Sequence, residues 1–383
     1  MERQVVLKSL KVGFLSSQNY LDRNSFSGIL YYMRNALIAR GIKVIDLGEP
    51  RKPSRLRDFY YRVLKSGNTP KVGSNRYIAE STKFASKIKK QLSQIPCDVI
   101  FAPVAKREIS FIETNIPIVS LSDATFILFE KNYQINLDKE EREWESKQES
   151  IAISKASKLV YSSEWAANSA ISDYQADAAK IEVIPFGANL DEPPLATEVL
   201  SQKHTSSCRL LFIGRDWSRK GGDIAFQTLT CLNERGVNAE LVVVGTTPPP
   251  EIKHEKLRVI PYLNKNVPQQ RKQFDELFLK SNFFIFPTRA DCSPIVICEA
   301  NAFGLPVFTT DVGGIPTIIK NGRNGYMLPL SASGEDYANL IVEKFSDKGV
   351  YDNLARSSRE EYDTRLNWDK WAESLHQVIM SIK

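Results

Sequence analysis

Two carboxylates stand eight positions apart in the stretch 283–329, the most distinctive part of the sequence. Asp291 lies in a loop after an expected strand over 283–286, and Glu299 lies on an expected helix that begins near Pro294. A proline is tolerated in a first helical turn, because its missing N–H would have no partner there. Carboxylates accept hydrogen bonds strongly, and loops that leave the carboxyl ends of strands bind ligands in α/β sheets. The pair therefore predicts a binding site for a ligand rich in hydroxyl groups.

A pair of cations forms the second candidate site. An apolar strand is expected over 209–213, and it runs into the sequence GRDWSRKGG, which carries Arg215 and Lys220. A guanidinium can bind two oxygens at once, and an ammonium supplies a point charge. Two cations held together can therefore stabilise negative charge that develops on a bound anionic group. No Asp-x-Asp sequence occurs in the chain, which fits a site that needs no metal or other cofactor.

Both stretches resemble the donor site of the retaining glycosyltransferases of family 4, the GT-B type. One family pattern is an acid, seven residues, Glu-Ala, then Gly-x-Pro-Val and a later Gly-Gly, and the other is Gly-Arg, four residues, Lys-Gly. The matching residues are Gly214, Arg215, Lys220, Gly221, Asp291, Glu299, Ala300, Gly304, Pro306, Val307, Gly313 and Gly314. The chain departs from the pattern at Asp291, where Glu is commoner, and at Pro294, where many members have Gly. Since proline has no backbone N–H, one sugar contact of the relatives is expected to be lost or moved.

The resemblance implies an α/β fold of two facing Rossmann-like domains with a donor cleft between them. It also implies a nucleotide-diphosphate sugar as donor, with UDP- and GDP-sugars as candidates, and an acceptor hydroxyl on a glycan, lipid or small molecule. Arg215 and Lys220 would stabilise the leaving diphosphate, Glu299 would hold the ribose, and Asp291 with its neighbours would hold the donor sugar. The other donor-binding residues expected in this way are Gly214, Ser293, Pro294 and Ile295, with Tyr262 near the nucleotide base.

The first half of the chain carries two weaker candidates, Gly28 and Asp123. Gly28 stands where a helix is expected to start after a strand over 10–16, and free backbone amides there could bind an anion. The resemblance brings this loop near the diphosphate and the acceptor, whereas a plain helix N-cap explains Gly28 equally well. Asp123 lies in a loop where many family members carry a histidine, and this chain has none before His204. Asp123 is the nearest substitute and is expected to be catalytic, with a helix N-cap as the alternative.

The segment Arg51–Arg76 is the most uneven part of the chain in charge. It holds eight basic residues against Asp58 alone, a local net charge of +7, which exceeds the +6 of the whole chain. Three aromatic residues lie among these charges. Such a segment could contact anionic lipid or a phosphorylated acceptor, although a solvated surface is the commoner outcome. Nucleic-acid binding is not expected, because no recognised binding motif accompanies the patch.

Length and composition indicate an ordinary soluble protein of two domains. The chain has 383 residues, of which 42% are hydrophobic and 25% are charged. An N-terminal acceptor domain is expected over 1–190, a linker over 191–207 and a donor domain over 208–366. The last segment, 367–383, has a helical apolar stripe, and the resemblance implies that it packs back on the first domain.

The expected location is the cytoplasm, with a peripheral contact on the inner membrane face as a further expectation. The five cysteines form no CxxC pair, as is typical of reduced thiols. The N-terminal sequence has no uninterrupted apolar run of the kind found in secretory signals, and no apolar run reaches the ~18 residues that span a bilayer.

Two other functions remain open. A nucleotide-sugar epimerase of the same fold would use general bases beside the sugar, and the absence of histidine from the first half counts mildly against it. A non-catalytic protein that binds sugar nucleotides is suggested by Pro294 and by the sparse site in the first half. The absence of a GxGxxG sequence after the first strand counts against a nicotinamide or flavin enzyme.

Overall fold

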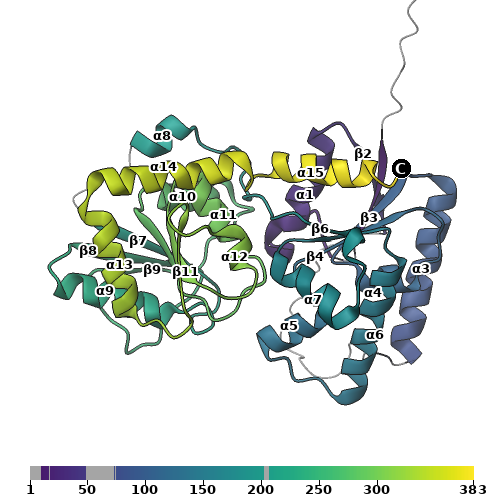
Figure 1. Cartoon of the computed structure of the whole chain (residues 1–383), viewed down its shortest axis with the longest axis horizontal. Coiled ribbons are helices and arrows are strands. Elements are labelled where there is room, and N and C mark those ends of the chain that lie inside the picture. Colours follow the sequence, from purple (N-terminus) through teal and green to yellow (C-terminus); the bar gives the residue numbers. More distant parts are fainter. Residues whose placement is uncertain (1–9, 17, 49–72, 74, 202–206) are drawn as a thin grey trace, which may run out of the picture. The chain divides into compact units, whose positions relative to one another are not determined.

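The computed structural model describes residues 10–16, 18–48, 73, 75–201 and 207–383. The chain divides into two compact units (Figure 1). Unit 1 comprises Met1–Ile184 and Ala372–Lys383, and unit 2 comprises Pro185–Trp371. The basic side chains of the segment Arg51–Arg76 lie outside the described residues.

Unit 1 is built on a parallel sheet with the strand order β2-β1-β3-β4-β5-β6. Its strands are β1 (Lys11–Leu15), β2 (Lys43–Leu47), β3 (Val99–Pro103), β4 (Ile118–Ser122), β5 (Lys158–Tyr161) and β6 (Ile181–Val183). Its helices are α1 (Ile29–Ala39), α3 (Asn75–Gln94), α4 (Lys106–Phe111), α5 (Phe126–Tyr133), α6 (Lys139–Lys155) and α7 (Glu164–Tyr174), with short 3₁₀ turns at Ser25–Gly28 and Ala178–Lys180. The central strands are short and almost wholly apolar, as strands buried on both faces of a parallel sheet must be.

Unit 2 is built on a second parallel sheet, in which β7 and β10 lie side by side at the centre. The strand order is β12-β11-β10-β7-β8-β9. Its strands are β7 (Cys208–Ile213), β8 (Ala239–Val244), β9 (Leu257–Ile260), β10 (Phe283–Phe286), β11 (Val307–Thr310) and β12 (Gly325–Leu328). The chain runs outward from β7 to β9, returns to β10 and then runs outward on the other side, so the order reverses between β7 and β10. In open α/β sheets, ligands bind beyond the carboxyl ends of the strands at such a reversal.

The helices of unit 2 cover both faces of this sheet (Figure 1). They are α8 (Ala196–Ser201), α9 (Gly222–Glu234), α10 (Pro268–Leu279), α11 (Ile295–Ala302), α12 (Ile315–Ile318), α13 (Gly334–Ser346) and α14 (Lys348–Thr364). Successive residues of a strand point to opposite faces. Phe284 and Phe286 accordingly join a core with residues of α10 and α11, whereas Phe283 and Ile285 join a core with residues of α9 and α13. Strand β10 is therefore packed on both faces of the sheet, which holds in place the start of the loop that follows it.

The described part of the expected linker, residues 191–201, is more ordered than its polar composition predicts. It contains α8, whose Val199 is fully buried. Arg359 of α14 donates from Nη1 to the Pro194 carbonyl at 2.6 Å and to the Ala302 carbonyl at 2.9 Å. These contacts join the segment to unit 2, and the change from one unit to the other falls at Ile184–Pro185. The expected boundary at residue 190 is therefore some residues late.

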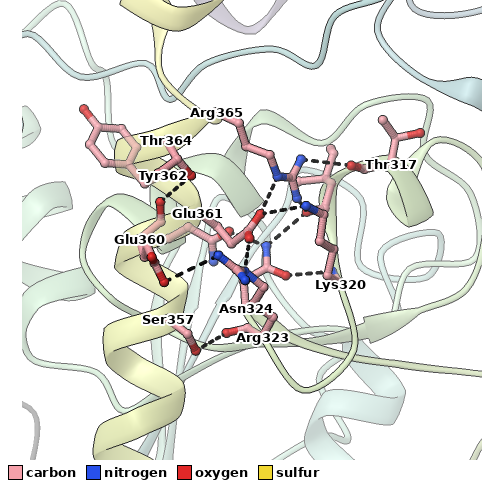
Figure 2. Close-up of polar contacts among 12 residues, drawn as sticks. Thr317, Lys320, Arg323, Asn324, Ser357, Glu360, Glu361, Tyr362, Thr364 and Arg365 are labelled. Atoms are coloured by element: carbon pink, nitrogen blue, oxygen red, sulfur yellow. Dashed lines mark hydrogen bonds and ion pairs between the residues drawn. The ribbon is translucent and has the colours of Figure 1, made fainter.

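The end of α14 is held by a buried carboxylate, Glu361, which is 1% exposed (Figure 2). Arg323 and Arg365 both form ion pairs with it, and Lys320 lies 3.7 Å away. Burial would raise the pKa of Glu361, but the hydrogen bond and charge of Arg365 keep that pKa below its ordinary value. Arg365 also donates to the carbonyl of Thr317 at 3.0 Å. The network thus fastens α14 to the end of α12.

After α14 the chain continues into α15 (Trp368–Met380). Trp368 and Trp371 are buried, and Trp368 Nε1 donates to Asn189 Oδ1 at 3.0 Å within unit 2. From Ala372 onward the helix belongs to unit 1. There the C-terminal Lys383 lies 3.5 Å from a carboxylate oxygen of Asp98.

Candidate active site

Four loops of unit 2 leave the carboxyl ends of β7, β9, β10 and β11 and carry most of the expected site residues. They are 214–222 after β7, 261–267 after β9, 287–294 after β10 and 311–314 after β11. Strand β10 occupies 283–286, α11 begins at Ile295 with Pro294 as its N-cap, and β11 occupies 307–310. The strands and the helix expected in the stretch 283–329 are confirmed.

The loops after β7 and β10 are fastened to each other by their backbones. The N–H of Arg289 donates to the Arg219 carbonyl at 2.8 Å, and Arg219 Nη1 donates to the Ala290 carbonyl at 2.9 Å. Gly221 has a φ of +76°, and a Cβ there would lie 1.9 Å from the Pro287 carbonyl oxygen. Only glycine allows both this backbone conformation and so close an approach. The loops after β7 and β10, which lie at the reversal of strand order, are therefore held together.

Lys220 and Asp291 meet across these two loops. The Lys220 ammonium forms an ion pair with Asp291 Oδ2, and the two side chains are 13% and 10% exposed. The same ammonium lies 4.9 Å from the centroid of the Phe286 ring. An ammonium has three N–H donors, so the ion pair leaves donors for an anionic ligand. The structure thus joins one residue of each sequence motif.

The loop after β11 packs directly on Asp291. Gly313 has a φ of +56°, and a Cβ there would lie 1.9 Å from the Asp291 carbonyl oxygen. The next residue, Gly314, donates its N–H to the same oxygen at 3.4 Å. The close passage of the two backbones therefore requires glycine at position 313.

Glu299 forms a second ion pair, with a lysine that sequence reasoning did not single out. Lys265 Nζ, from the loop after β9, donates to Glu299 Oε1 at 2.6 Å. Glu299 is 1% exposed, and its other oxygen, Oε2, is buried without a hydrogen-bond partner among the described residues. A buried acceptor left unpaired is costly, and such an atom marks a place where a ligand can donate.

Asp275 of α10 is the second unexpected acid near this pair. Its Oδ1 is also buried without a hydrogen-bond partner among the described residues. Burial raises the pKa of Asp275 to about 6, Arg271 and Lys265 oppose this, and the negative charge of Glu299 adds to it. Sequence reasoning missed Lys265 and Asp275 because their importance comes from contacts between loops. The only signal available was the position of Lys265, three residues after Tyr262.

The remaining donor-binding candidates lie on the same loops. The Arg215 guanidinium lies 5.7 Å from the centroid of the Tyr262 ring, which links the loops after β7 and β9. Both side chains are exposed. A Cβ on Gly214 would lie 2.9 Å from Lys220 Cγ, so this glycine makes room for the lysine stem. Ser293, Pro294 and Ile295 are buried at the start of α11.

The two candidates of unit 1 also follow strands, but they lie in different loops. Gly28 has a φ of +84° and is the N-cap of α1, after a turn in which Phe26 and Ser27 also have positive φ. Asp123 follows β4, and the N-cap of α5 is Thr125, whose side chain accepts from the Leu128 N–H at 3.4 Å. The alternative in which Asp123 caps this helix is therefore wrong. The catalytic role of Asp123 stays a prediction.

Neither a metal centre nor a membrane span emerges from the described part of the chain. No group of three or more His, Cys, Asp or Glu side chains is arranged there to hold a metal ion. Among the same residues, no helix combines the length and the apolar character needed to cross a bilayer. The five cysteines are free thiols.

The part of the chain that carries these loops matches a known protein family. Residues 207–347 match the model of the family "Glycosyl transferases group 1". The D-inositol 3-phosphate glycosyltransferase of Gordonia bronchialis is 23% identical over 244 residues, which are 59% of this chain and 53% of that protein. The lipopolysaccharide glucosyltransferase WaaG of Escherichia coli is 27% identical over 50% of this chain and 54% of its own length. The chain thus spans about half the length of these two curated relatives.

Solved structures share the fold over nearly the whole chain. The sucrose-phosphate synthase of Thermosynechococcus elongatus has a TM-score of 0.67 at 16% identity, with 98% of this chain and 99% of that chain covered. The WaaG structure has a TM-score of 0.61 at 18% identity, with 97% and 99% covered. The Anabaena protein Alr3699/HepE, solved with UDP, has a TM-score of 0.65 at 13% identity, with 98% and 100% covered. Residues 207–347 therefore resemble the glycosyl transferases group 1 family, and the chain as a whole has the GT-B fold of these solved structures.

Proposed function

We propose that the protein is a retaining glycosyltransferase that moves a sugar from a nucleotide-diphosphate sugar to an acceptor hydroxyl, without a metal ion. The observation that carries the proposal is the ion pair of Lys220 and Asp291 at the reversal of strand order in unit 2. A cation and an acid held together there suit a ligand with an anionic diphosphate and a sugar rich in hydroxyls.

Unit 2 supplies the donor site in this proposal. Lys220, assisted by Arg215, stabilises the negative charge on the leaving diphosphate, since preorganised cations act where charge develops. Asp291 and the buried start of α11 hold the donor sugar. Glu299 accepts a hydrogen bond from the ribose through Oε2, the oxygen that no described residue occupies. Tyr262 lies in the loop after β9, where its ring centroid is 5.7 Å from the Arg215 guanidinium, and contacts the nucleotide base.

The reaction exchanges one bond at the anomeric carbon for another. The bond from the anomeric carbon to the diphosphate oxygen breaks, and the electron pair leaves with the diphosphate. The acceptor oxygen bonds to the anomeric carbon on the same face, and its proton passes to the diphosphate. The configuration is therefore retained, and the enzyme needs no base stronger than the leaving group. Gly28 and Asp123 of unit 1 are assigned to the acceptor side of this reaction.

UDP- and GDP-sugars are the donors that we assign. Support comes from HepE, a protein of the same fold whose structures contain UDP, and UDP with glucose. The acceptor is a hydroxyl of a glycan, lipid or small molecule. Contact of the segment Arg51–Arg76 with an anionic membrane stays a prediction, because its basic side chains lie outside the described residues.

A turnover assay with and without acceptor tests the proposal and its alternatives. The protein is first screened by thermal shift against UDP-, GDP- and ADP-sugars, and the donor that stabilises it is then used for turnover in the presence of EDTA. We expect acceptor-dependent release of the nucleotide diphosphate and a product with the anomeric configuration of the donor. Interconversion of the sugar without acceptor would favour an epimerase, and binding without turnover would favour a binding protein. Loss of activity in EDTA that Mg²⁺ or Mn²⁺ restores would overturn the metal-free site.

A further inference from the structure

Lys265 is held in a short loop whose backbone is fixed at several points. The N–H of Asn264 donates to Gln270 Oε1 at 2.7 Å, and the N–H of Val267 donates to the Asn264 carbonyl at 2.9 Å. The Lys265 ammonium lies 4.2 Å from the centroid of the Phe274 ring, and its side chain is 20% exposed. A lysine stem fixed at its base and packed on an aromatic face has lost most of its usual freedom.

The contact with Lys265 makes the two oxygens of Glu299 different. Oε1 accepts from the Lys265 ammonium at 2.6 Å, whereas Oε2 is buried without a hydrogen-bond partner among the described residues. A charge-assisted hydrogen bond fixes the orientation of the carboxylate more firmly than a neutral one. Lys265 therefore decides which oxygen of Glu299 stays open to a ligand.

The surroundings of this pair contain more acids than cations. Besides Glu299, the charged neighbours of Asp275 are Arg271 on its own helix, Lys265 in the loop after β9 and Asp191 in the segment after β6. Arg271 Nη1 lies 3.4 Å from Asp191 Oδ2. Three carboxylates thus share two cations, and removing Lys265 would leave Glu299 and Asp275 with one cation fewer.

We propose that Lys265 is a positioning residue that orients the carboxylate of Glu299 and leaves Oε2 as its one acceptor for a ribose hydroxyl. The inference rests on the proposed function, in which Glu299 holds the ribose. It adds a specificity: one of the two ribose hydroxyls contributes strongly to nucleotide affinity and the other contributes little, because Oε1 is already occupied.

Calorimetric titration with matched nucleotides tests this inference. The whole chain is titrated with UDP, GDP and ADP, and the tightest of the three is compared with its 2′-deoxy and 3′-deoxy forms. For the wild type we expect one deoxy form to bind about 10- to 100-fold more weakly, the size of one hydrogen bond to a charged acceptor, and the other to bind nearly as well as the parent. For Lys265→Met we expect the parent and both deoxy forms to bind within about threefold of one another.

Three further variants control this comparison. Lys272→Met changes an exposed lysine on α10 and should keep the wild-type discrimination. Lys265→Arg keeps the charge and should restore most of the discrimination. Lys265→Gln keeps a hydrogen-bond donor without a charge, and its discrimination between the deoxy forms should lie between those of the wild type and Lys265→Met. This variant keeps the test valid even where the methionine variant folds poorly.

The outcomes separate this inference from the proposed function. A wild type that binds none of the three diphosphates overturns the proposed function and the inference with it. A wild type that binds them without discriminating between the ribose hydroxyls overturns the inference alone. Discrimination that persists in both Lys265→Met and Lys265→Gln also overturns it, because Glu299 would then be oriented without Lys265.

Discussion

Units 1 and 2 have similar architectures but arrange polar groups differently at the ends of their strands. In unit 2, Lys220–Asp291 joins the loops after β7 and β10, and Lys265–Glu299 joins the loop after β9 to helix α11; both carboxylates are at least nine-tenths buried. In unit 1, Asp123 directly follows β4, whereas Gly28 precedes α1 in the loop after β1. The bidentate ion pair of unit 1, Arg34 with Asp46 at 2.8 Å, joins α1 to β2 within the sheet region.

The difference shows how each unit can contribute to one reaction. Buried ion pairs are weak evidence for stability, because removing charges from water offsets much of their attraction. Two such pairs at the ligand-binding edge of one sheet are better explained by binding than by folding. Unit 2 is thus expected to determine nucleotide affinity, whereas unit 1 is expected to act on the acceptor. The following substitutions test this division, in order of expected effect.

Lys220→Ala should have the largest effect, a loss of about 10²–10³ in turnover, because it removes a preorganised cation from the leaving group. Steady-state kinetics with the donor found by screening provides the measurement. Lys272→Ala, on the exposed face of α10, is the matched control and should be neutral. Turnover of Lys220→Ala within about threefold of the wild type would remove this lysine from the site.

Gly313→Ala should disturb the Asp291 loop, because a Cβ at this position would lie 1.9 Å from the Asp291 carbonyl oxygen. Gly236→Ala is the control, since Gly236 has a similar φ of +78° with nothing within 4 Å of the added atom. The positive φ alone costs about 1–2 kcal/mol, and the close contact adds to this only at Gly313. We expect Gly313→Ala to melt at a lower temperature than Gly236→Ala and to bind nucleotide more weakly. Equal behaviour of the two variants would show that the Asp291 loop tolerates displacement.

Asp275→Asn should stabilise the protein at high pH. The pKa of Asp275 is raised from 3.8 to about 6, so the folded state holds this proton more tightly than the unfolded state. The resulting stabilisation is full below the lower value and is lost as the pH rises through about 6. Asparagine removes the ionised carboxylate. At pH 8 this should raise the free energy of unfolding by about 1–2 kcal/mol, after allowance for screening at a partly exposed group. Melting curves should show a higher midpoint for the variant at pH 8 and a smaller difference at pH 5, and a difference that is independent of pH would refute the assignment.

Asp123→Asn should have the smallest effect on nucleotide binding. Asp123 belongs to unit 1, whereas the proposed nucleotide contacts belong to unit 2, so we expect the affinity to change by no more than about twofold. Calorimetric titration of the nucleotide diphosphate measures this directly, and turnover measured in parallel tests its catalytic role. A large loss of nucleotide affinity would break the proposed division between the units.

Much of the candidate site in unit 2 could be predicted from the sequence because its constraints are local. Strand β10 is an apolar run, Pro294 marks the start of α11, and the spacing of Asp291, Glu299 and the Gly-Gly pair is fixed along the chain. The glycine at position 313 of the Gly-Gly pair has a physical reason, because its backbone passes directly beside Asp291 and leaves no room for a Cβ.

Other features could not be predicted because they depend on contacts between distant segments. The pairing of Lys265 with Glu299 spans 34 positions, and nothing near Lys265 indicates its partner. Helix α8 lies in a polar segment and owes its order to Val199 and to contacts with α14. The loop after β4 contains both Asp123 and Thr125, and only the backbone geometry shows that Thr125 is the cap.

The central claim is that the four loops of unit 2 form the site for a nucleotide diphosphate, and hydrogen–deuterium exchange with and without the ligand tests it most directly. The ligand is whichever of UDP, GDP and ADP binds most tightly. Bound nucleotide should slow exchange in peptides that cover 214–222, 261–267, 287–299 and 311–315, because those loops lose access to solvent on binding. Binding that leaves exchange in these peptides unchanged, or that slows exchange only in unit 1, would contradict the account.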